Sequence, residues 1–138
     1  MAEDPTKPAT NQSTSKFDLE ERTAAFGEAI IEFAMSIKES AVMRPLISQI
    51  VRAGTSAGAN YCEADDAVSR KEFVLKINTC RKETRETKFW LRMIVKADPN
   101  LRDPAAVLWK ESNELHLIFS KIRRTTLANS SPTSPPNS

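Results

Sequence analysis

The sequence predicts an all-α protein, an antiparallel up-down-up-down four-helix bundle with disordered N- and C-terminal tails. Glycine and proline are sparse between residues 17 and 127, whereas an all-β fold needs a turn about every 8 to 12 residues. Apolar residues recur there at steps of three and four in four segments, the spacing of one helix face. The breaks between the segments are short, so consecutive helices are expected to lie side by side and antiparallel. A chain of 138 residues fits one domain.

The two ends of the chain are rich in Pro, Ser, Thr and Asn and lack the large apolar side chains that could offset the entropy lost on ordering. We therefore expect a disordered tail over residues 1–16, the bundle over 17–127 and a second disordered tail over 128–138. No apolar run approaches the ~18 residues that cross a bilayer, and the N-terminus lacks the apolar core of a secretory signal. A soluble, cytoplasmic protein without a membrane partner is expected.

The first helix is expected to begin at Asp18, whose carboxylate can accept a backbone hydrogen bond. Glu21 follows three residues later and completes a box-like pair. The apolar stripe of this helix consists of Thr23, Phe26, Ile30, Phe33 and Ile37.

The second helix follows a break around residues 39 to 43, and Pro45 fits its first turn, where a missing N–H is harmless. Its seam consists of Ile47, Ile50, Gly54, Ala57, Tyr61 and Ala64. A glycine inside a helix costs about 1 kcal/mol relative to alanine. We therefore expect a neighbouring helix to approach closely at Gly54 and Gly58.

The third and longest helix is expected to open with a capping box formed by Ser69 and Glu72. Its seam consists of Phe73, Ile77, Cys80, Thr84, Thr87, Leu91 and Ile94. The seven-residue repeat of this seam favours coiled-coil-like packing at a shallow crossing angle.

A fourth helix is expected after Pro99, which limits the third. Asp103 is the expected cap, with Pro104 at the first helical position. The apolar side of this helix consists of Leu108, Leu115, Phe119 and Ile122 and extends to about Thr125.

Charge is distributed unevenly, although the whole chain carries a net charge of only +2. Residues 18–38 have a net charge of −3 and residues 69–97 a net charge of +6. The candidate nucleic-acid-binding residues of the third helix are Arg81, Lys82, Arg85, Lys88, Arg92 and Lys96. Four of them lie along one side of the helix, where they can track phosphates, because they follow one another at steps of four, three and four: Arg81, Arg85, Lys88 and Arg92. The alternative is a solvated face with intrahelical ion pairs, such as Glu72 with Lys76 or Lys82 with Glu86.

Phe89, Trp90 and Met93 lie beside the seam of the third helix rather than on it. They could widen the core, stack on unpaired bases or become buried against another subunit. Burial in the core or between subunits is the favoured interpretation, which makes them candidates for an oligomer interface. Trp109 on the fourth helix is interpreted in the same way.

No catalytic residue, cofactor or metal site is predicted, and the protein is not expected to be an enzyme. His116 is the single histidine and has no nucleophile or carboxylate at a recognisable spacing. The acidic group Glu63, Asp65 and Asp66 lacks the glycine and alternating oxygen ligands of a calcium loop. An ion pair between this group and a basic residue of the third helix is the default expectation.

Cys62 and Cys80 are isolated, so the spacing typical of zinc and redox motifs is absent. Buried thiols in a reducing cytoplasm are the expected state, with a disulfide between them as the less favoured alternative.

A long motif in the second helix, RAGTSAGANYCEA over residues 52–64, is followed by KETRETKFWLR over residues 82–92. Over about residues 17–125 the chain resembles the four-helix-bundle family encoded in intervening sequences of bacterial 23S ribosomal RNA genes, often labelled as a ribosomal protein. The same fold family includes the accessory variability protein of diversity-generating retroelements. The residues that carry the resemblance are Arg52, Gly54, Thr55, Ser56, Gly58, Asn60, Tyr61 and Glu63.

The physical interpretation of this signature is mostly architectural. Its glycines would admit a neighbouring helix, and Thr55, Ser56 and Asn60 could hydrogen-bond to neighbours. Arg52 and Glu63 are candidates for ion pairs that set helix register or form a subunit contact.

The resemblance implies a ring of identical subunits, typically a pentamer. It also implies basic surfaces that bind nucleic acid and a partner reverse transcriptase in the retroelement relatives. The leading hypothesis is a non-catalytic homo-oligomer that binds RNA or DNA backbone through the basic face of the third helix. The alternatives are a protein adaptor, such as a reverse-transcriptase accessory subunit, and a purely structural oligomer.

Overall fold

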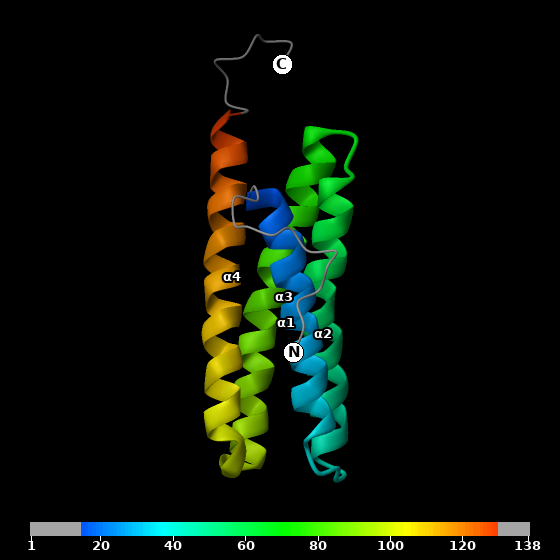
Figure 1. Ribbon diagram of the computed structural model, residues 1–138, viewed down its shortest axis with the longest axis vertical. Coiled ribbons are helices and arrows are strands. Elements are labelled where there is room, and N and C mark those ends of the chain that lie inside the picture. The colour runs from blue at the N-terminus through cyan, green and yellow to red at the C-terminus, as the bar shows by residue number, and fades with distance from the viewer. Residues whose placement is uncertain (1–14, 130–138) are drawn as a thin grey trace, which may run out of the picture.

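The computed structural model describes residues 15–129, and this part of the chain is helical and contains no strand. The elements are α1 (Ser15–Met35), α2 (Met43–Asp65), α3 (Arg70–Ala97), the 3-10 turn η1 (Pro99–Leu101) and α4 (Arg102–Asn129). Figure 1 shows that successive helices run in opposite directions. The all-α four-helix fold is therefore confirmed. The tails expected over residues 1–16 and 128–138 lie, apart from two residues each, outside the described residues.

Helix α1 begins earlier than expected, and its core face is as expected. It starts at Ser15, so Asp18 lies inside the helix and is not its N-cap. The five residues of its predicted stripe are all buried, although the last of them, Ile37, follows the end of the helix. The sequence spacing therefore identified the buried face correctly and the first residue of the helix incorrectly.

The capping box at the start of α3 is confirmed. The Ser69 hydroxyl oxygen accepts a hydrogen bond of 3.1 Å from the backbone N–H of Glu72. The Glu72 carboxylate in turn accepts one of 3.2 Å from the backbone N–H of Val68. Two N–H groups at the helix end, which have no partner within the helix, are thereby satisfied.

Helix α4 begins before its predicted cap. The Asp98 side chain accepts a hydrogen bond of 3.1 Å from the backbone N–H of Asn100 and so caps η1. This turn runs directly into α4 at Arg102, and Asp103 lies in the first helical turn. The predicted Asp103 cap is therefore wrong, because Asp98 already opens the helical backbone.

The core lies along the predicted seams of all four helices. Of the seam residues only Ile47, Phe73 and Ile122 are half-buried. The contacts form a closed ring in which each helix packs on its sequence neighbour and α4 meets α1 less extensively. No helix within residues 15–129 is long and apolar enough to cross a membrane.

Small residues let the helices approach one another. A Cβ added to Gly58 of α2 would lie 3.3 Å from the hydroxyl oxygen of Thr23 on α1, and Gly54 is closer still to the same helix. On the other side of the bundle, the Ser112 hydroxyl of α4 donates a hydrogen bond of 2.8 Å to the carbonyl of Thr84 on α3. The close approach expected at the glycines of α2 is confirmed.

Candidate nucleic-acid interface

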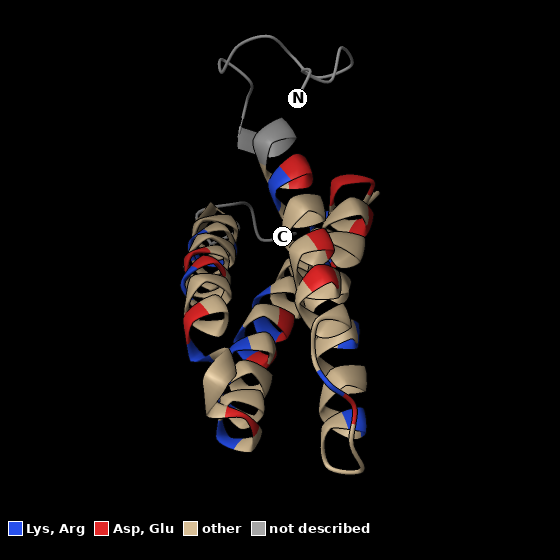
Figure 2. Cartoon of the chain, turned by 60° about the horizontal axis from the view of Figure 1, so that its bottom comes forward, with Lys and Arg blue, Asp and Glu red and all other residues tan. Residues whose placement is uncertain are grey.

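The two halves of the bundle carry opposite net charge. Residues 15–66 contain five Lys and Arg against nine Asp and Glu, a net charge of −4. Residues 70–129 contain fourteen Lys and Arg against seven Asp and Glu, a net charge of +7. In Figure 2 acidic residues follow one another along α1, whereas basic residues recur along α3. An anionic partner is therefore attracted to the α3–α4 half.

Three ion pairs between α2 and α3 involve two residues of the signature in α2, Arg52 and Glu63. Arg52 bonds to Glu83 at 3.2 Å and to Glu86 at 2.7 Å. Near the other end of α2, Glu63 pairs with Lys76. These contacts confirm that the two signature residues form ion pairs, and they lie within the chain, where they set the register of α2 on α3.

The same contacts correct the pairing expected within α3. Lys76 and Glu86 bond to α2, so the intrahelical pairs of Glu72 with Lys76 and of Lys82 with Glu86 are absent among the described residues. Further ion pairs join α1 to α4, where Arg22 bonds to Glu111 and Glu114.

The six predicted binding cations of α3 differ from these paired residues, because none has a carboxylate oxygen within 4.0 Å among the described residues. Two of the six donate to neutral acceptors instead. Arg81 bonds to Asn78 at 3.0 Å, and Lys88 bonds to Asn113 of α4 at 2.8 Å. The exposed members are Lys82, Arg85, Arg92 and Lys96. Their charge is left to solvent or to a ligand.

The stripe borders α4 at Lys88. The Lys88 ammonium lies over the ring of Trp109, 5.1 Å from its centroid, which is within the range of a cation–π contact. Burial and the neighbouring charge of Arg85 lower the pKa of Lys88. An anion placed beside Lys88 would relieve both effects, because it would offset the repulsion and replace lost hydration.

His116 of α4 lies against α3 near the same cations, and its hydrogen bond defines which ring nitrogen carries the proton. Its Nδ1 is 3.0 Å from the carbonyl oxygen of Arg81. A carbonyl only accepts, so Nδ1–H is the donor. Burial lowers the pKa of His116, and the charges of Lys88, Arg81 and Arg85 lower it further, against the opposing effect of the hydrogen bond to Arg81. The lowered pKa favours the neutral form of the ring at pH 7.

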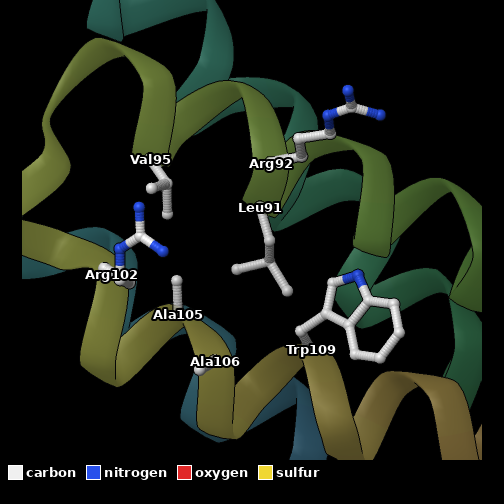
Figure 3. Close-up of a pocket in the computed structure, with 7 residues that line it drawn as sticks. All are labelled: Leu91, Arg92, Val95, Arg102, Ala105, Ala106 and Trp109. Atoms are coloured by element: carbon white, nitrogen blue, oxygen red, sulfur yellow. The ribbon is translucent and has the colours of Figure 1, made fainter.

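A hollow of about 280 Å³ lies between α3 and α4, beyond Lys88 toward the hairpin turn. Its apolar lining consists of Leu91, Val95, Ala105 and Ala106. Arg92, Arg102 and Trp109 complete the lining. Figure 3 shows Arg102 reaching from α4 toward Val95 at one end of the hollow, Trp109 at the other end, and the Arg92 side chain pointing outward. Sequence reasoning did not find this hollow or Arg102. The sequence signal that could have indicated the hollow is the spacing of Arg102 and Trp109, which lie two helical turns apart on α4.

The candidates for an oligomer interface differ in where they lie on α3: Trp90 lies on the side of α2, and Phe89 faces outward. Phe89 is 50% exposed, and its ring packs edge-on against Trp90 at 5.0 Å between centroids. The Trp90 indole N–H donates a hydrogen bond of 3.1 Å to Glu86, and Met93 is half-buried. Phe89 therefore lies outside the core of the single chain.

The remaining signature residues are structural. Thr55 donates a hydrogen bond to the carbonyl of Val51 at 2.7 Å, and Asn60 donates one to the carbonyl of Ser56 at 2.9 Å. These bonds stay within α2, whereas bonds to neighbouring elements were expected. Tyr61 is buried against Phe119 of α4, with ring centroids 6.1 Å apart. Burial raises the pKa of the Tyr61 hydroxyl to about 12.

The cysteines are unpaired, and one of them differs from expectation. Cys62 is exposed, whereas Cys80 is buried and its thiol donates to the carbonyl of Ala57 at 3.4 Å. No group of three or more His, Cys, Asp or Glu side chains within the described residues is placed to hold a metal ion.

Comparison with known proteins identifies the family. The model of the family described as 23S rRNA-intervening sequence protein matches residues 15–123. A crystal structure of a protein of unknown function from the S23 ribosomal protein family, from Bacteroides thetaiotaomicron, is 28% identical with a TM-score of 0.68. The match covers 76% of this chain and 97% of that one. No curated protein matches. The chain belongs to the 23S rRNA-intervening sequence protein family.

Proposed function

We propose that this protein is a non-catalytic homo-oligomer that binds the backbone of RNA or DNA through the basic face of α3. One observation carries the proposal. Six cations follow one another along α3 without a carboxylate within reach among the described residues, whereas Arg22 and Arg52 are each held by two carboxylates. These six cations of α3, called the ridge below, are therefore available to bind phosphates.

The mode of binding follows from the chemistry of the ridge. Lys and Arg neutralise phosphates and release condensed counterions, so affinity falls steeply as salt rises. Contacts with phosphates orient a nucleic acid without distinguishing one base from another. Binding at this face is therefore electrostatic and only weakly dependent on sequence.

Self-association is expected to use Phe89, Trp90 and Met93 of α3. Burying an exposed aromatic ring between subunits removes apolar surface from water. Lys88 and Trp109 meet on the α4 side of α3, and we expect association to leave that side open. The family resemblance favours a pentameric ring.

The direct test is a fluorescence anisotropy titration of a structured RNA at two salt concentrations. The variant Arg85→Glu/Arg92→Glu reverses two exposed ridge charges, and Lys38→Glu/Arg44→Glu makes the same change in charge at exposed positions in and beside the α1–α2 turn. We expect saturable binding at low salt that weakens at least tenfold in the ridge variant and little in the control. No saturable binding, or equal loss in both variants, would remove the proposal.

The second candidate is a protein adaptor, such as an accessory subunit of a reverse transcriptase. It is favoured by two exposed apolar side chains on the outward face of α3, Leu75 at 61% and Phe89 at 50% exposure. They are fourteen residues apart and so lie on the same side of the helix. A neighbouring gene for a reverse transcriptase with template and variable repeats would favour this candidate. An oligomer that binds neither RNA nor protein would be purely structural.

A further inference from the structure

The hollow between α3 and α4 combines an apolar lining with positively charged side chains. Its lining is apolar, the guanidinium group of Arg102 lies at one end of it, and that of Arg92 points outward from its α3 side (Figure 3). A bare phosphate would leave the apolar lining unfilled, and an apolar ligand would leave the cations without a counter-charge. A flat, weakly polar group joined to phosphates satisfies both.

The volume of the hollow and the indole of Trp109 indicate which ligand would fit. A volume of about 280 Å³ lies at the lower end of the range for small-molecule sites, so it suits one base-sized group. Trp109 is 44% exposed, and the ammonium of Lys88 lies over its ring. Aromatic side chains bind unpaired bases by stacking, whatever the base.

The position of the hollow links it to the cationic ridge. Arg92 belongs to both, and Lys88 and Arg85 precede it by one and two turns, respectively, on the same side of α3. A strand whose phosphates follow the ridge would be led to the hollow. The bases of a duplex are stacked inside and would have to leave the stack to enter it.

From this geometry we propose that the hollow binds one unpaired base of a single strand, with the base against Trp109 and the adjoining phosphates on Arg92 and Arg102. The inference rests on the proposed function, because the ridge must bind nucleic acid for the hollow to select its unpaired form. It adds a preference for single strands and unpaired loops over duplex.

The test uses the full chain with Trp90→Phe, which leaves Trp109 as the one tryptophan. A 12-residue oligouridylate and an RNA duplex of the same length serve as probes at equal salt. We expect the single strand to bind about tenfold or more tightly than the duplex and to quench the Trp109 fluorescence, because stacking on an aromatic side chain strengthens binding by about that factor. Equal affinities, or quenching by the duplex alone, would overturn the inference.

Variants separate stacking from general loss of charge. Trp109→Ala should bring the ratio of the two affinities to about one, and Trp109→Phe should retain most of it. Arg102→Gln should lower single-strand affinity more than Lys110→Gln, an exposed cation of the same helix that does not line the hollow. If Trp109→Ala fails to fold, the quenching of Trp109 fluorescence and the comparison of Arg102→Gln with Lys110→Gln still test whether the hollow binds a base.

Failure of the inference is distinguishable from failure of the proposed function. Binding of both probes with equal affinity, lost in Arg85→Glu/Arg92→Glu, removes the hollow's role and leaves the ridge. Binding of neither probe removes both.

Discussion

Ile30 of α1 packs directly over Gly54 of α2, so closely that a Cβ on the glycine would lie 2.8 Å from both γ carbons of the isoleucine. Both residues are buried, and Ile30 is fully enclosed. We expect Gly54→Ala to lower the free energy of unfolding by about 1 to 3 kcal/mol, the usual cost of overpacking a core. This loss outweighs the ~1 kcal/mol that alanine gains in helix propensity. Urea unfolding followed by circular dichroism measures the change.

Gly27 provides the matched control on the same pair of helices. A Cβ there would meet the nearest atom, Cα of Thr55, at 3.6 Å, which is an ordinary contact. Gly27→Ala should therefore stabilise the protein by up to about 1 kcal/mol through helix propensity. A change of the same sign in both variants would contradict the close approach at Gly54.

Arg22 clamps α1 to α4 where these helices meet least extensively. Its guanidinium bonds to Glu111 through two nitrogens at 2.7 and 2.8 Å and to Glu114 at 2.8 Å. These contacts raise its pKa further above the range where it could lose its charge. We expect Arg22→Met to cost about 1 kcal/mol, because it leaves two adjacent carboxylates uncompensated, and Arg22→Lys to restore only part. Equal stabilities of all three proteins would show that the clamp contributes nothing.

His116 makes stability depend on pH. Its folded-state pKa lies below the unfolded value of 6.5, mainly because of burial. The unfolded chain therefore binds more protons as the pH falls below about 6.5, and the folded state loses stability there. Between about pH 7.5 and pH 5, the free energy of unfolding of the wild type should fall relative to that of His116→Asn, which keeps a side-chain N–H near the carbonyl of Arg81. Parallel profiles for the two proteins would rule out this contribution.

The two cysteines should react at very different rates. Burial raises the pKa of the Cys80 thiol to about 12, and its sulfur is enclosed, whereas Cys62 is exposed. Because the thiolate is the reactive form, a thiol reagent should modify one cysteine per native chain and both after unfolding. Native Cys62→Ser should incorporate almost no label. Rapid labelling of native Cys62→Ser would contradict the burial of Cys80.

The parts of the fold that sequence predicted correctly are those set by local chemistry or by periodicity. The Ser69–Glu72 cap requires only residues three apart, and the heptads of α3 identify a buried face without knowledge of its partner. The signature glycines indicated a close approach, although not that Ile30 would make it. The first residues of α1 and α4 were misplaced, since more than one side chain near each end could cap.

The candidate site was only half predictable. Spacing placed Arg85 and Arg92 on one side of α3, which the structure confirms as exposed. The pairing of Arg52 with Glu83 and Glu86, and the meeting of Arg102 with Leu91 around one hollow, depend on how each helix is rotated against the next. No spacing within a single helix contains that rotation.

The salt dependence of RNA binding tests the central claim most directly, because it counts the phosphates that the ridge neutralises. Each contact contributes about 0.7 to the slope of log affinity against log salt for a single strand and about 0.9 for B-DNA. The account predicts that Arg85→Gln/Arg92→Gln reduces the steepness of this slope by about 1.5 relative to wild type. A slope that is unchanged in this variant would contradict the account, since it would mean that these guanidinium groups do not meet phosphates.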